Sequence, residues 1–241
     1  MHEVLTVVGR GWVRAAYWRI QAVLRGVSGS RPDERRFRKR PVEEVRAGFS
    51  NISLEHRPWL IDTLLEDHPS SLLEIGCGWG PNLQLLASQA PGAALTGVDI
   101  SPASIKEGRR QLVSAQIDGV SLLEGRADTL PLSAGTAVDT VFTDAALLYV
   151  GPDRIAQCVA EMFRVARRRI VLLEMHEAGA GPAGRYTRDG WIRDYGALLR
   201  PFLSGERKVR VRKLPAGLFT SGRWPDYGTL IDCDLTERPP A

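Results

Sequence analysis

Short apolar runs alternate with amphipathic segments from about residue 42 onward, and this pattern predicts the elements of the fold. The apolar runs predict strands at 71–75, 93–100, 120–125, 138–144 and 169–175. The segments around them predict helices at 54–67, 81–89, 102–116 and 152–168, and in the last of these the apolar residues recur on one side. Strands that alternate with helices predict a parallel sheet covered by helices on both faces.

The C-terminal part of the chain follows a different pattern. A helix is expected near 188–199, and the runs 208–214 and 228–235 follow it. These two runs predict an antiparallel, hairpin-like pair at one edge of the sheet. The sheet is therefore expected to be mostly parallel, with seven strands in all.

Residues 3–25 form a predicted amphipathic helix ahead of this α/β region. In one interpretation its apolar face packs on the domain or on a partner subunit. In the other, it lies on an anionic membrane with Trp12 and Trp18 at the interface. Gly, Ser and Pro indicate a linker at 26–36. We therefore divide the chain into an N-terminal helix and basic linker, 1–45, and an α/β domain, 46–241.

Charge and cysteine content narrow the classes of protein that fit. The net charge is +4, and "RPDERRFRKR" (31–40) is strongly basic. We interpret this run as a solvated linker and expect no nucleic-acid partner. The three cysteines lack metal-ligand spacing. Their odd number and the absence of a close pair argue against a disulfide framework and predict a reducing compartment. Arginines interrupt the N-terminal apolar stretch, so neither a secretory signal nor a membrane span is expected. We expect a cytoplasmic location, with attachment to the inner face of the membrane through 3–25 left open.

The stretch "LLEIGCGWG" (72–80) carries the most informative chemistry. Its three glycines follow a strand directly, which permits unusual backbone angles and the close approach of a ligand. The spacing differs from G-x-G-x-x-G, and no Lys-Ser/Thr pair follows as in a phosphate-binding loop. The acid Glu74 would repel a pyrophosphate but would attract a cationic amine or sulfonium.

This stretch resembles the first motif of the class I S-adenosylmethionine-dependent methyltransferases, E/D-x-G-x-G-x-G. "GVDIS", "GRADTLPL" and "VDTVFTDAALLYV" resemble the later motifs of that family and occur in the same order, so that the resemblance covers about residues 55–177. It implies the Rossmann-like class I methyltransferase fold, with a mostly parallel seven-stranded sheet and helices on both faces. The helix predicted at 3–25 would be an N-terminal helical extension of this fold. It also implies S-adenosylmethionine as the cofactor.

The resemblance assigns cofactor-binding roles to particular residues. The methionine part of the cofactor would lie along Gly76, Cys77 and Gly78, with Glu74 orienting the loop and the ammonium. The ribose hydroxyls would donate to Asp99, Ile100 would pack on the adenine, and Asp128 would accept from the adenine amine beside Ala127. Asp144 would lie below the methyl-transfer centre. The residues alone leave two alternatives open, in which Asp99 caps the following helix and Asp128 holds a turn.

A base is needed when a hydroxyl is the methyl acceptor. We expect His176, just past the fifth strand, and Asp144 to be the catalytic residues, with His56 as a second candidate for the base. Other candidates near these strand ends are Tyr149, Glu174 and Glu177. No metal is expected, because the spacing around "EMHE" fits no standard site.

The acceptor is only partly defined by the sequence. Enzymes that methylate nucleic-acid base amines resemble one another in a D/N-P-P-Y/F motif, which this chain replaces with "DAAL" (144–147). We therefore expect O-methylation of a hydroxyl on a small molecule, a glycan or a lipid-linked intermediate of a biosynthetic pathway. A non-catalytic partner or docking module is the alternative, and a nicotinamide oxidoreductase is a less favoured one. The sequence also leaves a homodimer open.

Overall fold

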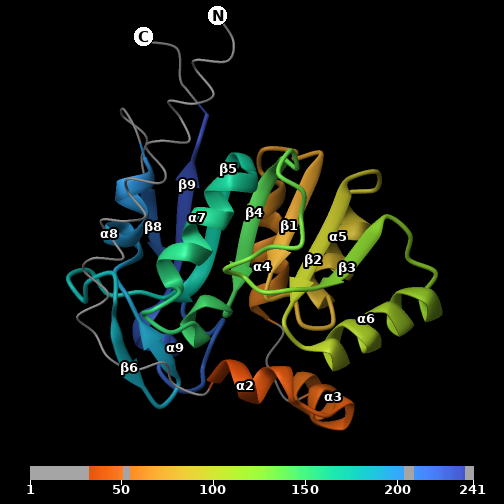
Figure 1. Ribbon diagram of the computed structural model, residues 1–241, viewed down its shortest axis with the longest axis horizontal. Helices are drawn as coiled ribbons and strands as arrows, with labels where there is room; N and C mark the ends of the chain where they lie inside the picture. The colour runs from red at the N-terminus through yellow and green to blue at the C-terminus, as the bar shows by residue number, and fades with distance from the viewer. Residues whose placement is uncertain (1–32, 51–54, 204–208, 237–241) are drawn as a thin grey trace, which may run out of the picture.

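The computed structural model describes residues 33–50, 55–203 and 209–236, and a twisted sheet runs through its centre (Figure 1). Its seven strands lie in the order β3 (Val120–Glu124), β2 (Ala94–Asp99), β1 (Ser71–Ile75), β4 (Val138–Asp144), β5 (Ala166–Met175), β9 (Gly228–Asp234) and β8 (Val209–Lys213). The first five strands in this order pair in parallel, which makes four parallel pairings. Strand β9 pairs antiparallel with both β5 and β8. The expected mostly parallel sheet with an antiparallel edge pair is confirmed.

Helices cover both faces of the sheet, as the near-continuous apolar strands require. On one face lie α4 (His56–Leu65), α5 (Pro81–Gln89) and α6 (Pro102–Ser114); on the other lie α7 (Ile155–Val165) and α8 (Tyr195–Leu199). Side chains alternate along each strand, so that in β5 Ile170 and Leu172 join the α7 side of the core while Val171 and Leu173 join the α4 side. One strand thereby helps to bury two separate apolar clusters.

The strand order reverses between β1 and β4, and this reversal leaves a crevice at the carboxyl ends of the parallel strands. Helices α2 (Asp33–Arg38) and α3 (Val42–Ser50) lie across this end of the sheet in Figure 1. An ion pair between Arg46 Nη2 and Glu107 Oε2, 2.6 Å apart, ties α3 to α6. The remaining short elements are η1 (Leu147–Tyr149), β6 (Arg185–Thr187), β7 (Gly190–Ile192), η2 (Arg200–Phe202) and α9 (Trp224–Tyr227).

Two predicted helices are wrong in their extent. The helix expected at 152–168 ends at Val165, and β5 begins three residues earlier than predicted because Ala166 already pairs with Val138 of β4. The helix expected near 188–199 begins only at Tyr195. Residues 185–192 instead form the antiparallel β6–β7 hairpin, whose turn the chain makes at Arg188 and Asp189.

The linker expected at 26–36 is also wrong from Asp33 onward, where α2 begins. Its sequence, "DERRFR", places acids in the first turn and bases in the last, which favours a helix through its dipole. Arg38 and Lys39 are exposed, as a solvated run requires, but Phe37 and Arg40 line a cavity. The predicted amphipathic helix at 3–25 lies outside the described residues, and the predicted domain boundary at 45/46 falls inside α3.

Candidate functional site

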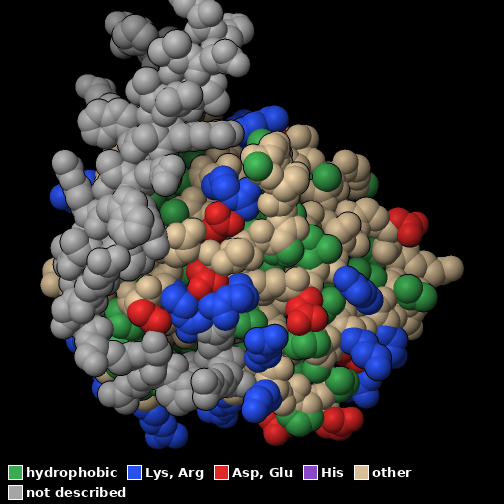
Figure 2. All heavy atoms as spheres, in the orientation of Figure 1, with side chains coloured by type: hydrophobic (Ala, Val, Ile, Leu, Met, Phe, Trp, Pro, Cys, Tyr) green, Lys and Arg blue, Asp and Glu red, His purple; other side chains and the backbone are tan. Residues whose placement is uncertain are grey.

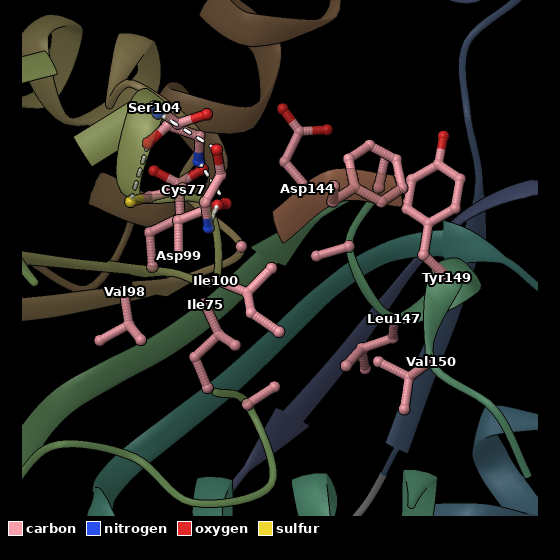
Figure 3. A pocket seen from close by; sticks show the side chains of 18 of the residues that line it. Ile75, Cys77, Val98, Asp99, Ile100, Ser104, Asp144, Leu147, Tyr149 and Val150 are labelled. Carbon is pink, nitrogen blue, oxygen red and sulfur yellow. Dashed lines mark hydrogen bonds between the residues drawn. The ribbon is translucent and has the colours of Figure 1, made fainter. Parts of the chain in front are cut away.

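A cavity of about 470 Å³ occupies the crevice at the ends of β1, β2 and β4. Figure 3 looks into it, with Cys77 and Asp99 on one side and Asp144 and Tyr149 on the other. The structure gathers all the residues that the sequence suggested for cofactor binding around this one cavity: Glu74, Gly76, Cys77, Gly78, Asp99, Ile100, Ala127, Asp128 and Asp144. They come from four different strand ends or loops, so only the fold brings them together.

The glycine loop after β1 adopts backbone angles that side chains disfavour. Gly76, Gly78 and Gly80 have φ values of 78°, 56° and 82°. A Cβ added to Gly76 would lie 2.3 Å from the Cβ of Ala146 in the loop after β4, so the two loops approach too closely for any other residue. The loop then ends in Gly80, the residue that precedes the first turn of α5.

Asp99 at the end of β2 is fixed by two backbone donors. Its Oδ2 accepts from Gly78 N at 2.9 Å and its Oδ1 from Ser101 N at 2.8 Å. Burial raises the pKa of Asp99, and these two hydrogen bonds oppose the rise. The alternative in which Asp99 caps the next helix is wrong, because the cap of α6 is Ser101, whose hydroxyl accepts from Ser104 N.

The loop after β3 supplies the far wall of the cavity. Asp128 lines it beside Ala127, and a bidentate pair with Arg126, at 2.9 and 2.7 Å, holds its carboxylate. The same segment turns through a hydrogen bond from Thr129 N to Arg126 O. Asp128 therefore sits in a turn and lines the cavity at the same time, so the two interpretations of this residue are compatible.

Three buried side chains near the glycine loop have polar atoms that lack a hydrogen-bond partner among the described residues. They are Oε2 of Glu74, Oδ1 of Asn82 and Nε of Arg57. Asn82 Nδ2 donates to Glu74 at 2.7 Å and to Asp144 at 3.0 Å, which leaves its own oxygen free. Burial raises the pKa of Glu74 to about 8. Two acceptors and one cationic donor at one end of a cavity match a ligand with an ammonium and a carboxylate.

His56 and Asp144 form a buried pair at the end of β4. His56 Nε2 lies 3.0 Å from Asp144 Oδ2, and the histidine is only 2% exposed. Burial alone would raise the pKa of Asp144, but His56, Asn82 and the nearby charge of Arg57 lower it overall. An ionised Asp144 can only accept, so the proton of the imidazole lies on Nε2. The other ring nitrogen, Nδ1, is buried without a partner in the described structure, in a side chain that lines the cavity.

The structure does not place His176, the expected base, with this group. His176 is buried behind the strand ends, does not line the cavity, and its Nδ1 accepts from Tyr195 N at 3.1 Å. Burial lowers the pKa of His176. Glu177 pairs with Arg185 at 2.9 Å, also away from the cavity. The sequence placed both residues past β5 correctly, but β9 and the β6–β7 hairpin cover that strand end.

Glu174 holds the loop after β4 and is not exposed to the cavity. Its two oxygens accept from the backbone N–H groups of Ala146, Leu147 and Leu148 at 3.0, 2.8 and 3.1 Å. The buried Arg193 donates to the carbonyls of Leu147 and Val150 from the other side. This loop carries Ala145 in the left-handed region, at φ 55°, and faces the glycine loop. Its shape is therefore built by residues that are distant in sequence.

Aromatic residues line the side of the cavity away from the glycine loop. Phe219 stacks on His56 at 4.1 Å and on Trp224 at 4.3 Å, measured between ring centroids. Phe37 of α2 meets Tyr149 at 4.5 Å. The sequence leaves open whether Phe49, Trp59, Tyr186 and Trp191 form walls around an acceptor or belong to the core. Tyr186 lines a neighbouring cavity, whereas Trp191 is buried and Trp59 packs against the core; the side chain of Phe49 lies outside the described part.

Several site residues were missed because the sequence gives them little signal. Arg57 follows the candidate His56 directly, and Asn82 lies in the first turn of α5, just after the glycine loop. Their closeness in sequence to these features was the only hint. Phe37, Phe219 and Trp224 lie in segments without a clear pattern. Within the described residues, no group of three or more His, Cys, Asp and Glu gathers as a metal site would need, and no helix is long and apolar enough to cross a bilayer.

Comparisons with known proteins agree with this geometry. Residues 72–169 match the family described as "Methyltransferase domain". A trans-aconitate 2-methyltransferase of Paracidovorax citrulli is 34% identical over 82 residues, which is 34% of this chain and 30% of the relative. A demethylmenaquinone methyltransferase of Thermus thermophilus is 29% identical over 157 residues, 63% of this chain and 66% of the relative. The chain thus matches only about a third of the trans-aconitate relative's length.

Solved structures share the fold. A SAM-dependent methyltransferase from Aquifex aeolicus superposes with a TM-score of 0.60 at 14% identity, covering 82% of this chain and all of the other. At this identity the likeness concerns the fold alone.

Proposed function

We propose that this chain is a class I S-adenosylmethionine-dependent methyltransferase and that it transfers the methyl group of that cofactor to a hydroxyl of a small molecule; the match of residues 72–169 to the methyltransferase-domain family supports the proposal. The observation that carries the O-methylation is the His56–Asp144 pair, because transfer to a hydroxyl requires a proton acceptor beside the acceptor oxygen. The glycine spacing and the unpaired atoms of Glu74, Asn82 and Arg57 support this cofactor over a dinucleotide, so we set the oxidoreductase alternative aside.

The chain's own residues fit S-adenosylmethionine from end to end. We assign the ammonium to Glu74 Oε2 and Asn82 Oδ1, and the carboxylate to Arg57, since these are the buried polar atoms without partners. The glycine loop borders the part of the cavity that we assign to the sulfonium and the methionine chain, and we assign the ribose hydroxyls to Asp99 as donors. Ile100, Ala127 and Asp128 form the adenine side of the cavity. When bound, the cofactor supplies an activated methyl group on a sulfonium.

His56 is the proposed base. Asp144 holds the proton on Nε2, so Nδ1 carries the free lone pair and accepts the proton of the acceptor hydroxyl. Asp144 then stabilises the imidazolium across a 3.0 Å hydrogen bond. The stacked ring of Phe219 keeps His56 in this orientation and helps to exclude water from it. The roles first given to His176 pass to His56.

The cofactor is tested by calorimetric titration with S-adenosylmethionine, S-adenosylhomocysteine and NADH. We expect micromolar-range binding of the two adenosyl compounds and none of NADH. Asp99→Ala removes both hydroxyl acceptors and should weaken binding about tenfold or more, whereas Asp99→Asn keeps one acceptor oxygen and should lose less. If neither adenosyl compound binds, the non-catalytic docking module becomes the favoured function.

The base is tested by turnover of hydroxylated small molecules, measured as S-adenosylhomocysteine formation. His56→Asn should lower kcat by about 10²- to 10⁴-fold while cofactor affinity stays unchanged. His68→Asn is the matched control, because His68 is exposed outside the cavity and its φ of 44° suits asparagine. An active His56→Asn enzyme would show that no base is needed, as for an acceptor that is already ionised.

A further inference from the structure

The cofactor cavity continues into a second, outer cavity of about 900 Å³. Phe37, Arg40, Tyr149, Ser221 and Trp224 line both cavities, so the two adjoin. The outer cavity lies beyond the His56–Asp144 pair and is bounded by α2, the β6–β7 turn and the segment that leads into α9. A molecule with its hydroxyl at His56 therefore extends into this outer space.

Arginines from three separate parts of the chain converge on the outer cavity. Arg36 and Arg40 come from α2 and its end, Arg188 from the β6–β7 turn and Arg223 from the start of α9. Figure 2 shows blue side chains gathered over the lower part of the face, where Figure 1 draws α2. Four guanidinium groups around one hollow create a positive potential that favours an anion.

The acids beside these arginines neutralise them only in part, because, among the described residues, four arginines but only two acids, Asp189 and Asp226, line the outer cavity. Of the two acids that line the outer cavity, Asp189 is engaged by a backbone donor, since its Oδ2 accepts from Arg223 N at 3.1 Å. Within the described segments, Arg36, Arg188 and Arg223 form no ion pair within 4.0 Å, and their side chains are exposed. Arg40 Nε is buried without a hydrogen-bond partner and lies 4.0 Å from Glu44. The guanidinium groups of Arg36, Arg188 and Arg223 are thus available to a ligand, whereas Arg40 is paired with Glu44.

Aromatic rings connect the base to the arginines. His56, Phe219 and Trp224 form a continuous stack, with successive ring centroids 4.1 and 4.3 Å apart, and Trp224 reaches the outer cavity. The Phe37–Tyr149 pair lines both cavities as well. Such walls favour a planar or apolar molecular body between the two polar ends.

We propose that the methyl acceptor is a small hydroxylated molecule with an apolar, preferably aromatic, body and a remote carboxylate or phosphate. Its hydroxyl lies at His56, its body along Phe219 and Trp224, and its anionic group at Arg188 and Arg223, with Arg36 and Arg40 adding charge. This assignment rests on the proposed function for the position of the hydroxyl, but the anion site is tested without turnover.

The test is a calorimetric titration with benzoate, phenyl phosphate and neutral benzamide, with and without saturating S-adenosylhomocysteine. We expect at least one anion to bind about tenfold more tightly than benzamide and to bind more weakly as salt is added. The tighter of the two anions identifies the anionic group as carboxylate or phosphate. The double variant Arg188→Ala/Arg223→Ala should lose about tenfold in anion affinity without any change in S-adenosylhomocysteine affinity.

A matched double variant, Arg168→Ala/Arg212→Ala, removes the same charge from exposed strand positions outside both cavities and should bind like the wild type. The inference is overturned if benzamide binds as tightly as the anions, if neither anion binds at millimolar concentration, or if both double variants behave alike. A wild-type chain that binds the anions but not S-adenosylhomocysteine would contradict the proposed function and leave the anion site standing.

Discussion

At the scale of single residues, Glu74 links the protonation state of the site to cofactor binding. Its carboxyl is buried, and burial raises its pKa to about 8, so at neutral pH most of it is protonated in the free protein. An incoming ammonium favours the ionised form. Binding should therefore release a proton, and cofactor affinity should rise with pH as the pH approaches 8.

Calorimetry in two buffers of different ionisation enthalpy at pH 7 measures this proton release. We expect close to one proton for the wild type and none for Glu74→Gln, which should also bind more weakly. The titration of the cofactor's own amine is common to both proteins and cancels in the comparison. An equal pH dependence of affinity in both proteins would show that Glu74 does not ionise on binding.

The same shift predicts an opposite effect on the stability of the free protein. The pKa of Glu74 is higher in the folded chain than the usual 4.5, so its contribution to stability falls as the pH rises from about 4.5 to about 8. Glu74→Gln removes this loss. The difference in melting temperature between Glu74→Gln and the wild type should therefore shift in favour of the variant as the pH rises from 5 to 8. This holds for the free protein, although the variant binds the cofactor more weakly.

At the scale of elements, the loop after β4 depends on one buried carboxylate. Glu174 accepts from three successive backbone N–H groups in and before η1, and this holds the loop against Gly76. Glu174→Ala leaves these donors buried and unpaired, and should cost about 3 kcal/mol or more in the free energy of unfolding. Glu174→Gln keeps one acceptor oxygen and should cost less.

Chemical denaturation measures both variants, and titration with S-adenosylhomocysteine shows the effect on the site. We expect the loss of affinity to follow the loss of stability, because the loop forms one wall of the cavity. A stable Glu174→Ala variant with normal affinity would mean that Arg193 alone holds the loop.

At the scale of the whole molecule, Arg169 joins the first helix of the domain to the antiparallel edge of the sheet. It is 4% exposed, forms a bidentate pair with the buried Asp232 of β9 at 2.9 and 3.0 Å, and donates to Thr63 O of α4. Removing it leaves a buried, uncompensated carboxylate. This cluster lies at the amino end of β5, away from the cofactor cavity.

Arg169→Met should therefore lower the free energy of unfolding by about 3–5 kcal/mol without changing the affinity of the folded protein for S-adenosylhomocysteine. Arg210→Met is the control, since Arg210 lies 3.9 Å from the same Asp232 but is exposed, and should cost less than about 1 kcal/mol. Chemical denaturation of both variants measures the free energy of unfolding, and calorimetric titration measures the affinity for S-adenosylhomocysteine. Equal losses would show that burial does not set the strength of the pair.

The sequence by itself determined the order and type of most elements and the composition of the glycine loop. Strands 71–75 and 138–144 have the predicted bounds, because buried parallel strands are short apolar runs between turn residues. Asp99 and Asp144 were found because their motifs resemble those of the methyltransferase family and place both acids at the carboxyl ends of parallel strands, β2 and β4, which flank β1. These features are local, so they can be read along the chain.

Only the tertiary structure decided which histidine faces the cavity and what surrounds it. His56 and Asp144 are 88 positions apart and meet because α4 begins beside the carboxyl end of β4, whereas β9 and the β6–β7 hairpin bury His176. The arginines of the outer cavity likewise come from three distant segments. Contacts between distant segments depend on how helices and loops pack on the sheet, and local hydrophobic periodicity does not encode that packing.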